Sequence, residues 1–138
     1  MSYLVDTNVI SELRKGARAD PEVRRWLESL DPDDVFLSVI VIGEIRRGIE
    51  SIRRRDASAA ASLDRWLKRV VSGHEGRILP VDARTADEWG RLNVPDPIPV
   101  VDGLMAATAK VHGLTLATRN VRDVKRTGVS LLNPFDLE

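Results

Sequence analysis

The chain has 138 residues, of which 43% are hydrophobic and 30% charged. This composition predicts a single globular domain over residues 1–138 and excludes a disordered or fibrous chain. Its 21 lysine and arginine residues balance 21 aspartate and glutamate residues, so no overall basic field indicates a polyanionic partner, and the absence of cysteine excludes disulfides and thiolate metal sites. Without a membrane-spanning run or the pattern of a signal peptide, we expect a cytoplasmic protein with no membrane contact.

Short apolar runs alternate along the chain with longer helical patterns. Strands are predicted, in chain order, at residues 3–5, 35–37, 78–81, 115–117 and, more weakly, 129–132. Helices are predicted around residues 9–14, 21–29, 39–52, 59–71, 83–92 and 101–112. This order predicts an α/β fold with an open, mainly parallel sheet of four or five strands, covered by helices on both faces. Ligands bind such sheets outside the carboxyl ends of the strands, so polar residues that follow strands are the first candidates for a site.

The first predicted strand ends on a carboxylate, Asp6, which Thr7 follows directly. A carboxylate is costly to bury without a partner, so Asp6 needs a compensating group. It is either the N-cap of the next helix or part of a functional site. Asn120 and Asp123 follow the fourth strand, so we expect them at the same edge of the sheet.

Two further acids belong to predicted helices. Glu44 falls beside the apolar arc of helix 39–52, at the border of the core. Asp102 is in line with Ala106, Ala109 and Gly113, a stripe of small residues that would let its helix lie close to the sheet. Each has a structural alternative: Glu44 as a partly exposed helical glutamate, and Asp102 as a favourable charge in the first turn of its helix.

Several carboxylates that met at one edge would raise each other's pKa values unless a cation lay among them. Neither a lysine nor a histidine is placed beside all of them in the sequence. Oxygen ligands suit Mg²⁺ or Mn²⁺ better than zinc. Such an ion activates water and stabilises charge on a phosphoryl oxygen, which predicts a phosphodiester or phosphomonoester substrate.

Four blocks of sequence resemble the PIN-domain ribonucleases, and particularly the VapC-type toxins of bacterial toxin–antitoxin pairs. They are "LVDTNVISEL", "LSVIVIGEIRRGI", "VVDGLMAATAKVHGLTLATRN" and "LLNPF", in order and over nearly the whole chain. The resemblance implies a three-layer α/β/α fold with a central, mainly parallel sheet. It also implies a Mg²⁺- or Mn²⁺-dependent endoribonuclease that cleaves structured RNA with an activated water, a homodimer, and a cognate antitoxin that covers the active site.

Carried over residue by residue, the resemblance makes Asp6, Glu44 and Asp102 the first three acids of the site. Asp6 and Asp102 are expected to hold the metal ion. At the fourth acidic position many relatives have an aspartate directly after "TR", whereas this chain has Asn120 there and Asp123 three residues later. Which of the two fills that position, and whether one ion binds or two, stays open.

The remaining roles follow the same hypothesis. Glu44 and Asp123 bind the ion through water or position the attacking water, while Thr7 and Asn120 steady the scissile phosphate or a ligand water. The arginine-rich stretch at residues 46–55 is either an RNA-binding surface, a contact with a second subunit or antitoxin, or a solvated helix face.

Two other functions are kept as alternatives. One is a phosphatase with an aspartyl nucleophile at Asp6, although such enzymes usually need a second acid where this chain has Asn8. The other is a non-catalytic module that binds RNA or protein. The tryptophans Trp26, Trp66 and Trp89 are predicted to be core or interface residues and not base-stacking ones.

Overall fold

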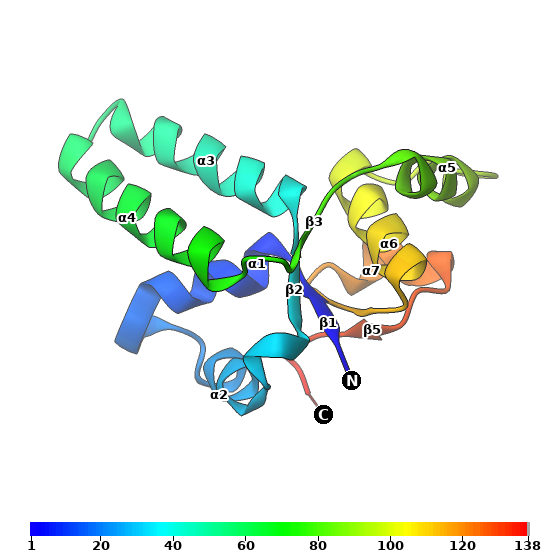
Figure 1. The fold of residues 1–138 in the computed structure, drawn as a ribbon, viewed down its shortest axis with the longest axis horizontal. Coiled ribbons are helices and arrows are strands. Elements are labelled where there is room, and N and C mark those ends of the chain that lie inside the picture. The colour runs from blue at the N-terminus through cyan, green and yellow to red at the C-terminus, as the bar shows by residue number, and fades with distance from the viewer. Residues whose placement is uncertain (138) are drawn as a thin grey trace.

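The computed structural model describes residues 1–137 as a three-layer α/β/α domain around a five-stranded parallel sheet (Figure 1). The strand order is β3-β2-β1-β4-β5, and every neighbouring pair is parallel. The strands are β1 (Tyr3–Val5), β2 (Val35–Ser38), β3 (Ile78–Leu79), β4 (Thr115–Ala117) and β5 (Leu131–Leu132). The predicted fold class is therefore confirmed.

Helices follow the strands as the apolar periodicity predicts. The helices are α1 (Thr7–Ile10), α2 (Pro21–Ser29), α3 (Val39–Arg53), α4 (Ala57–Gly73), α5 (Ala83–Leu92), α6 (Val100–His112) and α7 (Val121–Val124). Three 3₁₀ segments, Ser11–Arg18, Pro32–Asp34 and Lys125–Thr127, connect them. No helix within residues 1–137 is both long and apolar enough to cross a bilayer.

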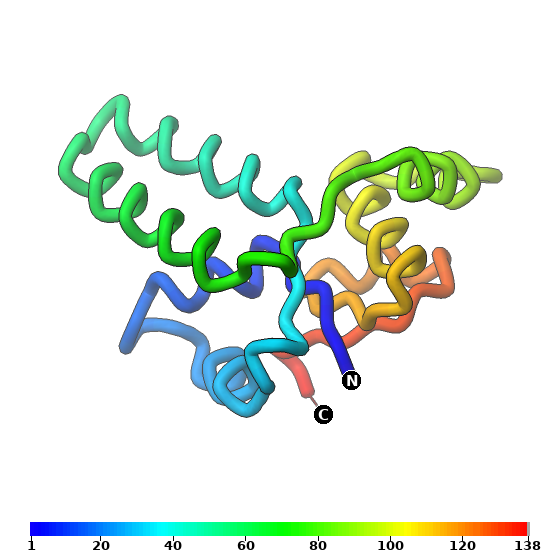
Figure 2. The backbone as a smooth tube through the Cα atoms, viewed as in Figure 1, coloured from blue at the N-terminus to red at the C-terminus, as the bar shows by residue number. Residues whose placement is uncertain are grey.

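The helices form two groups on either side of the sheet. In Figure 1, α1 to α4 lie on the left of the central strands, and α5, α6 and α7 on the right. α3 packs against α4 to form a hairpin, and α5 packs against α6. The chain trace in Figure 2 shows that the α3–α4 hairpin projects from the sheet as an arm.

The buried face of each element matches its sequence pattern. Leu4, Leu37 and Leu116, on three adjacent strands, are at most 1% exposed. Ala106 and Ala109 on α6 are fully buried, so the predicted stripe of small residues does allow α6 to pack closely.

The first helix differs from its predicted bounds of 9–14. It begins at Thr7, because the Asp6 side chain caps it, and after Ile10 the chain continues as a 3₁₀ segment to Arg18. Gly16 interrupts that segment with a φ of 57°, a conformation that glycine adopts at little cost. The third strand, predicted at 78–81, ends at Leu79, because Pro80 has no N–H to donate to a ladder.

Candidate active site at the carboxyl edge of the sheet

Asp6 lies directly after the central strand β1 and is only 5% exposed. Its Oδ1 accepts a hydrogen bond from the Thr7 N–H (2.7 Å). Its Oδ2 accepts one from the Thr118 hydroxyl (2.7 Å) and one from the Asn8 amide (3.3 Å). These donors supply the compensation that a buried carboxylate needs. Asp6 can be both the N-cap of α1 and part of a functional site, because in the N-cap position it also lines a cavity.

The position of Asp6 is the point at which the sheet order reverses. From β1 the chain adds β2 and β3 on one side and then β4 and β5 on the other, so β1 and β4 flank a topological switch point. Open α/β sheets bind ligands in the crevice at such a point. Here the Asp6 N–H donates to the Ala117 carbonyl (2.9 Å), and the Asn8 side chain accepts from the Arg119 N–H (3.2 Å).

Thr118 is a site residue that the sequence pattern did not predict. It is 1% exposed, and besides donating to Asp6 its hydroxyl accepts from the Asn120 N–H (3.0 Å). Thr118 therefore fixes both the Asp6 carboxylate and the backbone of Asn120. The signal that could have found it is its place directly after β4, which corresponds to the place of Asp6 after β1.

Glu44 reaches the same region from α3. That helix begins after Ser38, whose hydroxyl accepts from the Ile40 N–H (3.1 Å). Glu44 comes about one and a half turns later, where its Oε1 accepts a hydrogen bond of 2.5 Å from the Thr7 hydroxyl. Two segments 37 residues apart are thus joined beside Asp6.

Asp102 lies in the first turn of α6, as predicted. Burial raises its pKa most, and the negative charge of Asp6 raises it next. The Asn120 side chain lowers the pKa by hydrogen bonding, while the charges of Asp123 and Glu44 raise it further. All four predicted acids are therefore close enough to interact electrostatically.

Most of the predicted site residues line one cavity of about 420 Å³. It is lined by Asp6, Thr7, Asn8, Ser11, Glu44, Val101, Asp102 and Asn120. Asp123, on the short helix α7, is not among the lining residues, although its charge acts on Asp102. Within residues 1–137, neither a lysine nor an arginine lines this cavity, so the protein itself supplies no cation to its carboxylates.

Two of the carboxylates that line the cavity, Asp6 and Asp102, are in surroundings that raise their pKa values. Burial is the largest cause that raises the pKa of Asp6, ahead of the opposing hydrogen bonds from Thr118 and Thr7, and the charge of Glu44 raises it too. The net direction is upward for Asp6 and for Asp102. A cation in the cavity would reverse this direction.

The donor set of the cavity fits a hard divalent ion. In the described part of the chain, no three acidic or histidine side chains are placed to hold one ion together. Mg²⁺ needs no such cluster, because proteins usually bind it through one or two carboxylates and it keeps several waters. Zinc fits less well, because neither histidine nor cysteine of residues 1–137 lines the cavity.

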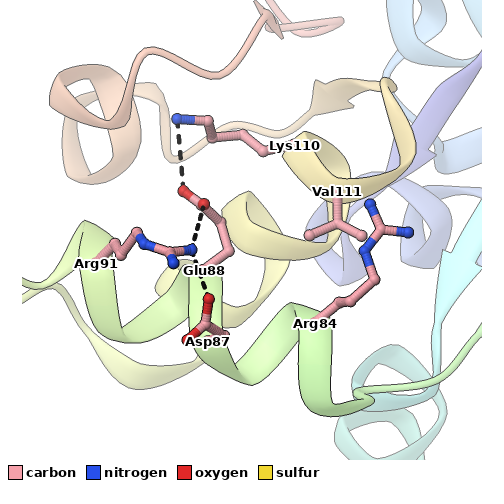
Figure 3. Close-up of a pocket in the computed structure, with 6 residues that line it drawn as sticks. All are labelled: Arg84, Asp87, Glu88, Arg91, Lys110 and Val111. Atoms are coloured by element: carbon pink, nitrogen blue, oxygen red, sulfur yellow. Dashed lines mark ion pairs between the residues drawn. The ribbon is translucent and has the colours of Figure 1, made fainter.

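A second polar hollow, between α5 and α6, has a different character (Figure 3). There, Arg91 pairs with Asp87 at 2.5 Å and lies 3.7 Å from Glu88, and Lys110 lies 3.6 Å from Glu88. Its acids are neutralised by basic side chains of the protein. The cavity at the carboxyl edge is therefore the candidate active site.

Comparison with known proteins agrees with this geometry. The family model described as "PIN domain" matches residues 3–129. The chain belongs to the PIN domain family. Toxin FitB of Neisseria gonorrhoeae is 34% identical to this PIN domain over 137 residues, which cover 96% of this chain and 97% of FitB. VapC ribonuclease Y4jK of Sinorhizobium fredii is 31% identical and covers 96% of this chain and 97% of its own.

Solved structures are also similar to this chain in both fold and sequence. The crystal structure of FitAcB from Neisseria gonorrhoeae superposes on this PIN domain with a TM-score of 0.90, at 34% identity, over 98% of this chain and 99% of that one. A structure of FitAB bound to an IR36 DNA fragment gives a TM-score of 0.88 at 33% identity, over 99% of this chain and 97% of that one.

Proposed function

We propose that this PIN domain is a Mg²⁺- or Mn²⁺-dependent endoribonuclease and the toxin of a toxin–antitoxin pair. The observation that carries the proposal is the cavity at the sheet edge, where Asp6, Glu44 and Asp102 come from three distant segments with no basic residue of the described chain among them. The names of two relatives, a toxin and a VapC ribonuclease, support the same activity.

Asp6 and Asp102 are the residues that would hold the ion, because both line the cavity and both have a raised pKa that a cation would lower. A bound divalent ion supplies two things to phosphodiester hydrolysis: a lowered pKa for water and stabilisation of charge on the phosphoryl oxygens. Thr118 orients Asp6 for this role through its 2.7 Å hydrogen bond.

The other lining residues have roles that their contacts support. Glu44 presents a carboxylate that accepts the Thr7 hydroxyl, so it is placed to accept a proton from an attacking water. The Asn120 amide offers a neutral donor to a phosphate oxygen or a water, and the Thr7 hydroxyl, whose hydrogen goes to Glu44, can accept from a ligand water. Asp123 contributes negative charge from outside the cavity lining. Position 8 is an amide that hydrogen-bonds to Asp6, so the general acid of an aspartyl phosphatase is missing.

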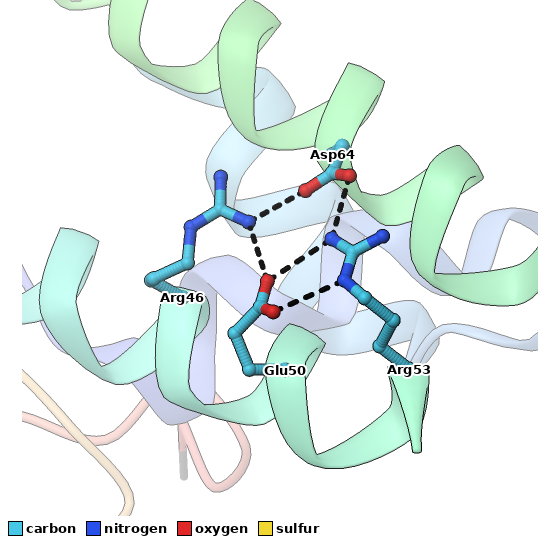
Figure 4. Close-up of polar contacts among 4 residues, drawn as sticks. All are labelled: Arg46, Glu50, Arg53 and Asp64. Atoms are coloured by element: carbon cyan, nitrogen blue, oxygen red, sulfur yellow. Dashed lines mark hydrogen bonds and ion pairs between the residues drawn. The ribbon is translucent and has the colours of Figure 1, made fainter. Parts of the chain in front are cut away.

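The α3–α4 arm supports an RNA substrate. Arg46 and Arg53 are held by Glu50 and Asp64 in a network that joins the two helices (Figure 4). Within residues 1–137, the other basic residues of these helices and the turn between them have no ion pair: Arg47, Arg54, Arg55, Arg65, Lys68 and Arg69. Unpaired cations on a projecting arm suit the phosphates of a nucleic acid.

Two partner proteins complete the proposal. A cognate antitoxin would be a separate chain that covers the cavity, and a second copy of the toxin would form a homodimer. The antitoxin is supported by the name of the relative FitB, a toxin, and by the structures of FitAB and FitAcB, in each of which one chain matches this one over nearly its full length. The homodimer rests on the resemblance to VapC-type toxins alone.

The test is cleavage of a structured RNA by the purified protein in Mg²⁺. Asp6→Asn and Asp102→Asn should each lower the rate by about a hundredfold or more, since even the outer partners of metal ligands are worth roughly 10- to 100-fold. The matched control is Asp96→Asn, an exposed aspartate that does not line the cavity. Circular dichroism checks that the variants are folded. Wild-type rates in both site variants would overturn the proposal.

A further inference from the structure

A second recess opens beside the candidate active site, lined by residues of α1, the 3₁₀ segment after it and the α3–α4 hairpin. It has a volume of about 110 Å³. Thr7, Ser11 and Glu44 line both this recess and the carboxylate cavity. The two hollows therefore lie side by side and share part of their lining.

The chemistry of the recess differs from that of its neighbour. Its walls are apolar side chains of α3 and α4, namely Ile45, Ile49, Ile52, Leu63 and Trp66, with Gly48 between them. The polar groups, Ser11 and Arg14, come from the 3₁₀ segment after α1. Arg14 is exposed and, within residues 1–137, makes no ion pair, so its charge is available to a ligand.

Trp66 is placed differently from the other two tryptophans. Trp26 is 9% exposed and packs edge-on against Tyr3, with 5.0 Å between the ring centroids. Trp89 lies against Gly103 in the contact between α5 and α6. All three tryptophans pack in or against the core, as predicted, and Trp66, half-buried like Trp89, also lines an open recess.

We propose that this recess binds one base of the RNA, from a nucleotide next to the scissile phosphate, with Trp66 as the stacking surface. The inference rests on the proposed function and adds a subsite to it. A phosphodiester held at the carboxylates must carry a nucleoside on each side, and the recess offers an apolar, ring-sized space that shares residues with that cavity. Flat bases stack on aromatic side chains with little regard to sequence, and Arg14 at the rim suits an adjoining phosphate.

Gly48 allows the recess to be filled by a substitution that replaces no acid. A Cβ added at Gly48 meets no heavy atom within 4 Å, and the same is true of Gly43 on the same helix. Five residues separate them, roughly 140° around α3, and Gly43 lines a different hollow with Ile42 and Leu67. Gly48→Leu and Gly43→Leu therefore bring the same gain in helix propensity, but only Gly48→Leu fills the recess.

The experiment measures cleavage of an RNA whose cut site has been mapped with the wild-type protein. Gly48→Leu should raise KM by about 5- to 150-fold, the range expected for loss of one base stack, with little change in kcat, while Gly43→Leu should leave both unchanged. Trp66→Ala should resemble Gly48→Leu, and Trp66→Phe should restore most of the affinity because it keeps an aromatic face.

A second arm identifies the occupant. The same RNA is made with an abasic nucleotide directly 5′ or 3′ of the scissile phosphate. At one of these positions the abasic change should raise KM for the wild type but not for Gly48→Leu, because the two changes remove the same interaction. Independent effects at both positions, or wild-type KM in Gly48→Leu, would overturn the subsite and leave the recess to a segment of a partner protein. Both outcomes leave intact the proposed function, which the aspartate variants test.

Discussion

Asp6 and Asp102 are both acids whose pKa is raised by burial, but the protein holds them in different ways. Asp6 receives three hydrogen bonds, from the Thr7 N–H, the Thr118 hydroxyl and the Asn8 amide. Among the causes that act on Asp102, only the Asn120 side chain lowers its pKa, and three other acids raise it. The ionised form of Asp102 therefore costs the metal-free folded state more than it costs the unfolded chain.

This difference predicts a pH-dependent gain in stability for Asp102→Asn. Because the pKa of Asp102 is raised above its ordinary value of 3.8, the folded state binds its proton more tightly, and wild-type stability falls as the pH rises from about 3.8 through the folded-state pKa. The variant lacks this loss. In EDTA, its Tm should equal that of the wild type near pH ~3.5 and exceed it by about 1–4 °C at pH ~7.5.

The matched control is Asp96→Asn, which should show no such trend. Asp96 is exposed, and among the described residues its side chain makes no hydrogen bond or ion pair. A Tm difference for Asp102→Asn that is the same at both pH values would contradict the raised pKa.

Thr118→Val tests the hydroxyl that orients Asp6. The change leaves a buried carboxylate short of one donor and the Asn120 N–H short of its acceptor, so the free energy of unfolding should fall by about 1–3 kcal/mol in urea titrations near neutral pH. Because the Thr118 hydrogen bond lowers the pKa of Asp6, its loss should also shift the acidic limb of the pH–rate profile to higher pH.

Two variants separate this role from simple packing. Thr118→Ser keeps the hydroxyl and should retain the wild-type pH profile. Thr108→Val removes another fully buried hydroxyl, one that donates only to the Leu104 carbonyl of its own helix, and should leave the pH profile unchanged. A pH profile for Thr118→Val that matches the wild type would rule out the positioning role.

At the scale of elements, the helical periodicity of apolar residues predicted the long helices, and short apolar runs between them predicted the strands. The helix predicted at 39–52 is observed as Val39–Arg53, and that at 83–92 is observed unchanged as Ala83–Leu92. The same periodicity placed Glu44 beside the core and Asp102 on a buried stripe, which is why three acids could be predicted at one edge.

The parts that sequence did not predict depend on contacts between distant segments. α7 has four residues and no side-chain N-cap bond, so no local pattern marks it. Around it, Asn120 lines the cavity and Asp123 does not, while which of the two fills the fourth acidic position stays a prediction. Thr118 was missed because its importance comes from a partner 112 residues away.

The basic residues at the tip of the α3–α4 arm predict how RNA affinity depends on salt concentration. Arg54 and Arg55, at the tip of the arm, lie outside the network that holds Arg46 and Arg53. A combined Arg54→Ala and Arg55→Ala variant should bind RNA more weakly and reduce the slope of log K against log salt by about 0.7 for each phosphate that it no longer neutralises. Fluorescence anisotropy of a labelled RNA at several salt concentrations measures the slope.

The matched control removes the same charge elsewhere. Arg24 and Arg25 lie on α2, at the bottom of Figure 1 and away from the tip of the arm. Their double alanine variant should keep the wild-type slope. Equal reductions in the two variants would mean that net charge, and not the arm, governs RNA affinity.

At the scale of the whole molecule, a net charge of zero conceals two regions of opposite sign. Residues 39–75 contain eight lysine and arginine residues and five aspartate and glutamate residues, whereas no basic residue of the described chain lines the carboxylate cavity. The neutral total is therefore compatible with the proposed RNA binding, in which the arm would attract phosphates and the cavity would require a cation before it accepts one.

This requirement predicts that a divalent ion stabilises the folded state. Because the metal-free fold retains carboxylates with raised pKa values, an ion that binds only the folded state should raise the free energy of unfolding, by about 2.7 kcal/mol at a concentration roughly 100-fold above its Kd. Wild-type Tm should therefore rise on titration with Mg²⁺ or Mn²⁺ at slightly alkaline pH, in NaCl adjusted to constant ionic strength. Asp6→Asn and Asp102→Asn should lose most of the rise, while Asp96→Asn keeps it. If the two site variants gained as much as the wild type, the ion would be binding elsewhere, and the crowding of acids at the sheet edge would need an explanation without metal.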